Sequence, residues 1–357
     1  MLSASEAEEL RARSDRFLTG HGPVRPADVL AAIPPGTAVD QYGEGGVVAE
    51  LETMVAALLG KPAAAFLPSG IMAQQAALRV HADRRGRRTV LSHPTSHLEL
   101  HEDRAIERVQ GLVGRAVGPA HALLSLADLE AVAERPAALL LELPQRELGG
   151  VLPAWDDVLA QVAWAHDRGA AAHLDGARIW EAAAGTGRSP ADLAAPFDTV
   201  YASFYKGIGA LAGCVLAGEP DVVAEVREWR RRLGGTLYGL WPAAASALVL
   251  LRRRLPLMPR YLEHARAIAA ALEPVPGVTL VPDPPQTAMF HALLDVPAEA
   301  VDARIRAIAD HHRVWLFRGA AATGDPRVQR VEVSVGDATL ELAPEEVAEL
   351  FGALVEA

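Results

Sequence analysis

The sequence contains a single cysteine, Cys214, among its 357 residues. One cysteine can form neither an internal disulfide nor a cysteine-cluster metal site, so the fold must be held together by its core. No apolar run approaches the roughly 18 residues that a membrane-spanning helix needs. The N-terminus, which is rich in Glu and Arg, lacks the apolar core of a signal peptide. We therefore expect a soluble cytoplasmic protein without a membrane partner.

Positive charge is also scarce. The 34 Lys and Arg residues are outnumbered by 45 Asp and Glu residues, which gives a formal net charge of −11. Nucleic-acid-binding proteins usually carry a basic footprint, so this balance argues against a nucleic-acid partner. The arginine clusters at 230–232 and 252–254 are expected to be solvated or to lie at subunit contacts. Half of the residues are hydrophobic, which is enough to bury a sizeable core.

Lysine is rarer still, since only Lys61 and Lys206 occur and the other 32 basic residues are arginine. A guanidinium stays protonated, whereas an amine can lose its proton and form a Schiff base. Lys61 lies in a turn after an expected helix, where a solvated cation is ordinary. Lys206 follows an expected strand and precedes Gly207 and Gly209, whose missing side chains let a planar ligand approach. We therefore predict that Lys206 forms a Schiff base.

An alternative interpretation of Gly207-x-Gly209 is a dinucleotide-binding loop. That fingerprint requires a helix directly after the glycines. Residues 215–217 are Val-Leu-Ala, which is typical of a strand, so the dinucleotide signal is weak.

Asp175 directly follows the apolar stretch 170–174, at the expected carboxyl end of a strand. Ligands of open α/β sheets bind at that edge. A carboxylate there can keep a pyridinium nitrogen protonated and so make the ring an electron sink. Taken alone, Asp175 is better explained as the N-cap of the next helix. Its position 31 residues before Lys206 favours the ligand role.

The segment 66–73 contains an apolar run, a small polar turn at Ser69-Gly70 and a helix that begins near Ile71. Backbone N–H groups and the helix dipole make such a turn an anion site, although a plain helix cap is equally compatible. A phosphate cradle, a pyridinium partner and an amine are together the parts that a pyridoxal phosphate enzyme needs.

Short apolar strands alternate with helices in the first two thirds of the chain, which indicates a parallel or mixed sheet covered on both faces. A helix is expected over 97–108. After Gly218, longer helices and then strands at 290–294, 314–317 and 330–335 indicate a smaller α+β domain. We predict an N-terminal segment (1–45), a large cofactor-binding α/β domain (46–254) and a small C-terminal α+β domain (255–357).

From about Asp40 to Glu356 the sequence resembles the L-threonine aldolase and β-eliminating lyase family. These are pyridoxal-phosphate-dependent enzymes of the aspartate aminotransferase fold, also called fold type I. The most specific signal is the pairing of Asp-Gly-Ala-Arg with Lys-Gly-x-Gly at this spacing. The matching segments are Asp40-x-Tyr-Gly-Glu44 with Leu51-Glu52, Pro68-Ser-Gly70, Ser96-His97, Gly149-Gly150-Val-Leu-Pro153, His173-Leu-Asp-Gly-Ala-Arg178, Lys206-Gly-x-Gly209 and Arg230-x-x-x-Gly234-Gly235.

The resemblance implies a role for each matching residue. Lys206 would carry the cofactor as a Schiff base, Asp175 would pair with its pyridine nitrogen, and His97 would stack on the ring and handle protons. Arg178 would lie near the cofactor O3′ or the substrate carboxylate, and Arg330 would bind the substrate α-carboxylate, plausibly in bidentate form. The residues expected to hold the phosphate are Ser69, Gly70, Ile71 and Ser203. The family also implies a homodimer or homotetramer with active sites built across subunits.

Several positions depart from the family pattern. Ile71 stands where the family usually has Thr, which removes one phosphate-binding hydroxyl. Residues 143–147 replace the Asn-Thr-His-Asn run of the aldolases, so that Gln145 stands where a His near the substrate β-hydroxyl is expected. Glutamine is not a general base. Arg146 faces either an anionic substrate or a carboxylate such as Glu147. Cofactor binding thus looks intact, while the substrate side, with Gln145 and Arg146, is rebuilt.

The spacing by four of His93, His97 and His101 can ligate zinc on one helix face. Pro94 argues against one continuous helix through all three, so no metal is expected.

The sequence therefore predicts a pyridoxal phosphate enzyme that cleaves a β-hydroxy-α-amino acid into glycine and an aldehyde, with His97 or a water as base. The alternatives are β-elimination or transaldol chemistry on a related amino acid, or a catalytically silent cofactor-binding protein.

Overall fold

The computed structural model describes residues 2–356, and the chain forms two compact units. The larger unit contains residues 27–147 and 152–256. The smaller unit contains residues up to Pro26, the segment Leu148–Val151 and everything from Leu257 onward. The domain boundaries that the sequence predicts, between residues 45 and 46 and between residues 254 and 255, stay a prediction.

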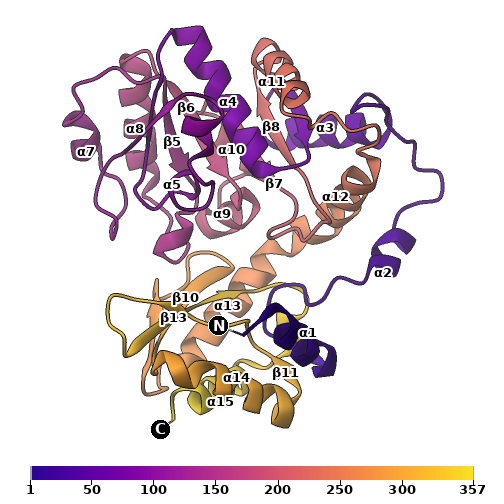
Figure 1. The fold of residues 1–357 in the computed structure, drawn as a ribbon, viewed down its shortest axis with the longest axis vertical. Helices are drawn as coiled ribbons and strands as arrows, with labels where there is room; N and C mark the ends of the chain where they lie inside the picture. The colour runs from indigo at the N-terminus through magenta and orange to yellow at the C-terminus, as the bar shows by residue number, and fades with distance from the viewer. Residues whose placement is uncertain (1, 357) are drawn as a thin grey trace. The chain divides into compact units, whose positions relative to one another are not determined.

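A seven-stranded sheet forms the centre of the larger unit (Figure 1). Its spatial order is β2-β8-β7-β6-β5-β3-β4. Strand β8 runs antiparallel to its neighbours β2 and β7, and the other pairs are parallel. This confirms the predicted α/β class with a mostly parallel central sheet. The strands are β2 (Ala63–Leu67), β3 (Thr89–Ser92), β4 (Val113–Ala116), β5 (Ala138–Glu142), β6 (Ala171–Gly176), β7 (Thr199–Ser203) and β8 (Cys214–Gly218).

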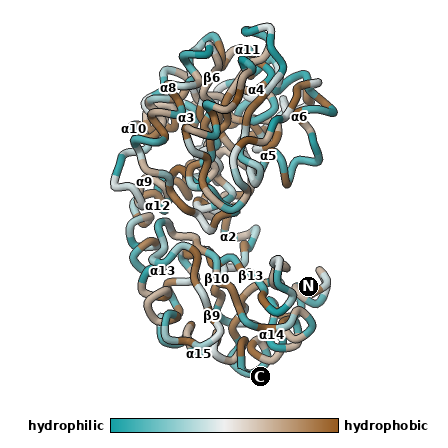
Figure 2. Tube along the Cα trace, turned by 90° about the vertical axis from the view of Figure 1, so that its left-hand side faces the viewer, coloured by the Kyte–Doolittle hydropathy of each residue, from teal (hydrophilic) through white to brown (hydrophobic). Residues whose placement is uncertain are grey.

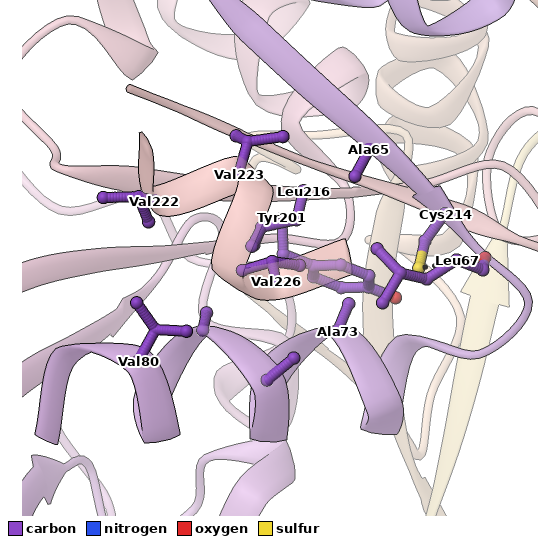
Figure 3. Packing of buried hydrophobic residues seen from close by; sticks show 12 residues of the cluster. Ala65, Leu67, Ala73, Val80, Tyr201, Cys214, Leu216, Val222, Val223 and Val226 are labelled. Atoms are coloured by element: carbon purple, nitrogen blue, oxygen red, sulfur yellow. Dashed lines mark hydrogen bonds between the residues drawn. The ribbon is translucent and has the colours of Figure 1, made fainter. Parts of the chain in front are cut away.

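Helices cover this sheet, as its continuously buried inner strands β6, β7 and β8 require. Figure 3 shows α4 and α11 packed against β2, β7 and β8, mainly through alanine, valine and leucine side chains and, on β7, through Tyr201. Cys214 lies within this cluster, with its Sγ 3.5 Å from the Leu67 carbonyl oxygen, and burial raises the pKa of its thiol. The helices of this part of the chain are α2 (Pro26–Ala31), α3 (Gly46–Leu58), α4 (Gly70–Arg85), α5 (His97–Leu100), α6 (Ala105–Arg108), α7 (Leu126–Glu130), α8 (Trp155–Asp167), α9 (Ile179–Thr186), α10 (Pro190–Ala194), α11 (Pro220–Arg232) and α12 (Trp241–Arg254).

The single helix predicted over 97–108 is wrong. The segment forms two one-turn helices, α5 and α6, because Asp103 and Arg104 adopt left-handed backbone conformations with φ of 50° and 58°. A left-handed residue cannot continue a right-handed helix. His97 is consequently the first residue of a short helix, close behind β3.

The smaller unit is α+β, as predicted. Its sheet has the order β12-β13-β10-β9 with every pair antiparallel, and a separate parallel pair joins β1 to β11. In both units the hydrophobic residues are concentrated in the buried core (Figure 2). No helix within residues 2–356 is both long and apolar enough to cross a membrane. The elements are α1 (Ala4–Arg13), β1 (Arg16–Phe17), α13 (Met258–Leu272), β9 (Val278–Val281), β10 (Met289–Asp295), α14 (Ala298–His312), β11 (Val314–Trp315), β12 (Ala321–Ala322), β13 (Val328–Ser334) and α15 (Pro344–Val355).

Candidate active site

The candidate site lies at the carboxyl edge of three neighbouring strands of the larger unit. Glu142 ends β5 and pairs in register with Asp175 of β6, while Lys206 follows the end of β7 by three residues. Parallel strands bring their carboxyl ends to one edge of a sheet. The charges that act on the Lys206 amine are those of Asp175, Arg178, Glu142 and Arg146. The structure thus brings together the lysine, the aspartate and two of the arginines singled out in the sequence.

Lys206 is held in a setting that favours its neutral amine. Burial is the main cause that lowers its pKa; the carboxylates of Asp175 and Glu142 raise it, and the guanidinium of Arg178 lowers it again. A lysine with a lowered pKa exposes a nucleophilic lone pair nearer neutral pH. The dinucleotide-loop alternative fails here, because the glycines after Lys206 lead into strand β8 and not into a helix.

Lys61 has a structural setting instead. Its Nζ donates to the Phe197 carbonyl oxygen at 2.6 Å and lies 3.5 Å from that of Ala195, just beyond the end of α10. It is partly buried, so the expectation of a solvated cation is wrong. The preference of cations for helix C-terminal ends explains this position.

Asp175 is 5% exposed, and both of its carboxylate oxygens accept hydrogen bonds. Gln74 Nε2 donates to Oδ2 at 2.6 Å, and the backbone N–H of Ala177 donates to Oδ1 at 3.0 Å. The N-cap position of α9 is held by Arg178, so the helix-cap interpretation of Asp175 does not apply. Its carboxylate is therefore fixed in place, at the sheet edge, by neutral donors.

The N-terminus of the 16-residue helix α4 has the features of a phosphate cradle. Ser69 is the N-cap, yet its side chain makes no capping hydrogen bond. A Cβ at Gly70 would lie 2.3 Å from Tyr201 Oη, so only glycine leaves room for the hydroxyl there. Ser203 Oγ is buried without a hydrogen-bond partner among residues 2–356. Backbone N–H groups of a first helical turn, Ile71 included, lack intrahelical acceptors and attract anions.

His97 is oriented by two carboxylates. Its backbone N–H donates to Glu142 Oε1 at 2.5 Å, and its ring Nδ1 lies 3.0 Å from Glu102 Oε1. Glu102 is 4% exposed; burial raises its pKa and the contact with His97 lowers it. With Nδ1–H directed at a carboxylate, Nε2 of the neutral ring is left as an acceptor. The sequence did not single out Glu102 as a site residue, and its only signal was its place five residues after His97.

The rebuilt segment after β5 is tied to the same carboxylates. Gln145, which is buried, donates from Nε2 to Glu142 Oε2 at 2.8 Å. Arg146 forms a salt bridge with Glu147 at 2.5 Å, and Glu147 Oε1 also lies 3.0 Å from His101 Nε2. The structure thus shows the carboxylate partner that was one of the two options for Arg146.

Glu142 provides a test of these electrostatics. Burial and the charge of Asp175 raise its pKa from the usual 4.5 to about 8, so the folded protein keeps a proton that the unfolded chain has released. Its contribution to stability is then complete below about pH 4.5 and is lost as pH rises through about 8. Glu142→Gln cannot ionise and so does not lose this stability. We therefore expect the melting temperature of the variant to rise relative to that of the wild type as pH increases from 5 to 9.

Calorimetry of the cofactor-free protein across that range measures the difference. Glu50→Gln, which removes an exposed carboxylate on α3, is the control and should follow the wild type. A melting-temperature difference between Glu142→Gln and wild type that stays constant with pH would contradict the raised pKa.

Of the three histidines spaced by four residues, His97 and His101 have ring centroids 5.2 Å apart, whereas His93 has separate partners. His93 Nε2 contacts the carbonyl oxygens of Pro119 and Ala122, while His97 and His101 contact Glu102 and Glu147. Within residues 2–356 no three His, Cys, Asp or Glu side chains are grouped as a metal site. Arg330 lies on β13 of the smaller unit, opposite Leu293 of β10 and Ala321 of β12.

The fold and this edge of the sheet define the class of fold type I pyridoxal-phosphate-dependent enzymes. The chain belongs to the β-eliminating lyase family, whose model matches residues 13–294.

Known relatives are similar over most of the chain. An aldolase of Penicillium aethiopicum, VrtJ, is 34% identical over 70% of this chain and 66% of its own length. Low-specificity L-threonine aldolase 1 of Arabidopsis thaliana is 25% identical over 83% of this chain and 86% of its own. The crystal structure of a candidate L-allo-threonine aldolase from Listeria monocytogenes EGD-E has 38% identity and a TM-score of 0.91, with 98% of each chain covered.

Proposed function

We propose that this protein is a pyridoxal-phosphate-dependent lyase that cleaves a β-hydroxy-α-amino acid into glycine and an aldehyde. The observation that carries the proposal is the half-buried amine of Lys206, on which the charge of the Asp175 carboxylate acts, at the edge of the sheet where α4 begins. The relatives named threonine aldolases support the substrate class.

The residues present fit this cofactor. The unused side chain of Ser69, the close approach at Gly70, the N–H of Ile71 and the unpartnered hydroxyl of Ser203 are suited to a phosphate. Asp175 would face the ring nitrogen, and Lys206 Nζ would hold the cofactor covalently. When bound, pyridoxal phosphate supplies a conjugated ring that takes up the electron pair released at the substrate Cα.

The other residues would bind substrate and move its proton. Arg330 would hold the α-carboxylate, and Arg178 would contact either that group or the cofactor O3′. His97 stacks on the ring in this proposal, and its Nε2, left as acceptor by Glu102, would take the β-hydroxyl proton directly or through a water. Gln145 cannot serve as the base. Its hydrogen bond to Glu142 would hold its side chain in place, so that Gln145 would line the substrate side of the site.

A second candidate is β-elimination or transaldol chemistry on a related amino acid. Gln145 favours it, because aldol cleavage needs a base at the β-hydroxyl and Gln145 occupies the position where the aldolases place a histidine. The same lysine, aspartate and phosphate cradle would serve either reaction.

A product assay separates these functions. The purified holoenzyme is incubated with L-threonine, L-allo-threonine and phenylserine, and amino-acid and carbonyl products are quantified. We expect glycine together with acetaldehyde or benzaldehyde. A keto acid with ammonia would identify the eliminating lyase. Transfer of the aldehyde to a second amino acid, added to the incubation as acceptor, would identify the transaldolase. No product from any substrate would favour a silent cofactor-binding protein.

We also propose that the chain forms a homodimer or homotetramer. Tyr42 and Tyr238 stack edge to face at 5.4 Å between ring centroids, and both are more than half exposed. Such a pair of large exposed aromatic side chains supports a subunit contact at this loop.

A further inference from the structure

A buried chain of hydrogen bonds runs from Asp175 to an arginine at the far end of α4. Gln74 bridges Asp175 and His173, with its Nε2 2.6 Å from Asp175 Oδ2 and its Oε1 against His173 Nε2. Thr199 Oγ1 lies 2.8 Å from His173 Nδ1 and 2.8 Å from His81 Nε2. The chain ends where Arg85 Nη1 lies 3.4 Å from His81 Nδ1. We call Gln74, His173, Thr199 and His81 the α4 chain.

The fold brings these four side chains together. Gln74 and His81 are seven residues apart on α4, two turns along one face. Each follows a residue of the apolar cluster in Figure 3, namely Ala73 and Val80. His173 lies two residues before Asp175 on β6, on the same face of the sheet, and pairs in register with Thr199 of β7.

All four members of the α4 chain are buried. Burying a polar group costs free energy unless its hydrogen bonds are made, and apolar side chains of similar size would fill this space without that cost. Four connected polar side chains beneath α4 therefore call for an explanation beyond packing.

The two ends of the chain fix the direction of every bond. A carboxylate only accepts and a guanidinium only donates, so Gln74 must direct Nε2 at Asp175 and Oε1 at His173. His173 then carries its proton on Nε2 and accepts the Thr199 hydroxyl proton at Nδ1. Thr199 Oγ1 in turn accepts from Nε2–H of His81, whose Nδ1 accepts from Arg85. The directions assigned from both ends agree.

Both histidines are held neutral by their surroundings. Burial lowers the pKa of His173 to about 3, with the charge of His81 lowering it and that of Asp198 raising it. Burial also lowers the pKa of His81 to about 4; Arg85 and Arg84 lower it further, while Asp198 raises it. A charged His81 would direct Nδ1–H at the Arg85 guanidinium, which is itself a donor. A charged His173 would direct Nδ1–H at Thr199 Oγ1, and the Thr199 hydroxyl proton would lose its acceptor on that ring.

We propose that the α4 chain is a positioning device for Asp175, which directs a line of neutral donors at its carboxylate without neutralising its charge. This inference rests on the proposed function, in which Asp175 faces a protonated ring nitrogen. A cation in place of Gln74 would hold the carboxylate equally well but would compete with the ring nitrogen for its charge. An amide donor fixes the orientation and leaves the full negative charge available to the ring. Gln74, His173, Thr199 and His81 are thus positioning residues.

Nitrogen NMR of the cofactor-free wild type tests the arrangement without any enzymatic readout. We expect His81 and His173 to be Nε2–H tautomers that do not titrate between about pH 5.5 and 8.5, a range that includes the ordinary histidine pKa of about 6.5. The variants His81→Gln and His173→Gln serve to assign the two signals. An Nδ1–H tautomer for either ring, or a titration near pH 6.5, would overturn the chain.

A matched pair of variants tests the effect on Asp175. Thr199→Val removes the hydroxyl at nearly constant shape, whereas Thr199→Ser keeps it. We expect the Val variant to lower kcat of the holoenzyme about tenfold with little change in KM, and to shift the pH at which the visible band of the bound cofactor changes. The Ser variant should restore both values toward wild type.

Equal kcat and equal spectral titration in the Val and Ser variants would overturn the positioning role. A wild-type holoenzyme without lyase activity would refute the proposed function instead, and the spectral titration and the NMR result would then still decide the inference.

Discussion

Lys206→Ala should lose the visible absorption band of covalently bound pyridoxal phosphate and at least about 10³-fold of the rate of glycine release. Lys206 is the half-buried amine at the sheet edge, and its pKa is lowered mainly by burial, so its lone pair becomes available at a lower pH than that of an exposed lysine. Alanine removes the nucleophile while Asp175 and the α4 N-terminus remain. The measurement is a visible spectrum of the reconstituted protein, beside the glycine assay.

The sequence provides a matched control, because Lys61 is its only other lysine. Lys61 Nζ donates to a backbone carbonyl beyond α10, so Lys61→Arg keeps a cation there and should retain both band and activity. A band that survives in Lys206→Ala, or that disappears in Lys61→Arg, would show that the cofactor lysine has been misassigned. Absence of a band from the wild type after reconstitution would refute the cofactor itself.

The features that the sequence predicted correctly are those carried by local patterns. Apolar runs separated by helices indicated the mostly parallel sheet, and the strand at 214–218 followed from three apolar residues after the glycines. Lys206 stood out because arginine replaces lysine almost everywhere else, so chemical function, not charge alone, explains its presence. These inferences depend on residues close together in the sequence.

The features that the sequence missed are long-range or depend on backbone conformation. Gln74 reaches Asp175 across 101 positions, and neither residue has a neighbour that reveals the other. Glu102 and Glu142 became site residues only once β5 and the loop after β3 were placed together. The break in the helix at Asp103 and Arg104 depends on left-handed conformations that helix propensity gives no reason to expect.

The N-terminal segment shows the same limit. Its first residues belong to the compact unit formed by residues after 257, where Arg16 of β1 pairs with Val314 of β11. A two-residue strand has too little hydrophobic pattern to predict its partner nearly 300 residues away. The local composition of the N-terminal segment indicates only that it is polar and does not predict the pairing of β1 with β11.

Asp175→Asn should leave cofactor binding nearly intact but lower the rate of glycine release by about 10²- to 10⁴-fold. Asparagine has the shape of aspartate, and its side-chain oxygen can still accept from Gln74 Nε2. It carries no negative charge, so nothing at this position would keep the ring nitrogen protonated. Because the Asp175 charge raises the pKa of Lys206, its removal should also lower that pKa further.

The experiment compares kcat, cofactor dissociation constant and the pH dependence of the visible band in Asp175→Asn and in Asp198→Asn. Asp198 accepts from the backbone N–H of Ala172 at the opposite end of β6, at 2.8 Å, so its variant controls for loss of a carboxylate bound to the same strand. If Asp175→Asn retained kcat within about threefold of wild type, the charge at Asp175 would not be the partner of the ring. If it lost the cofactor altogether, Asp175 would be required for binding more than for chemistry. The predicted combination, a bound cofactor with a slow reaction, follows only if the carboxylate acts on the ring through its charge.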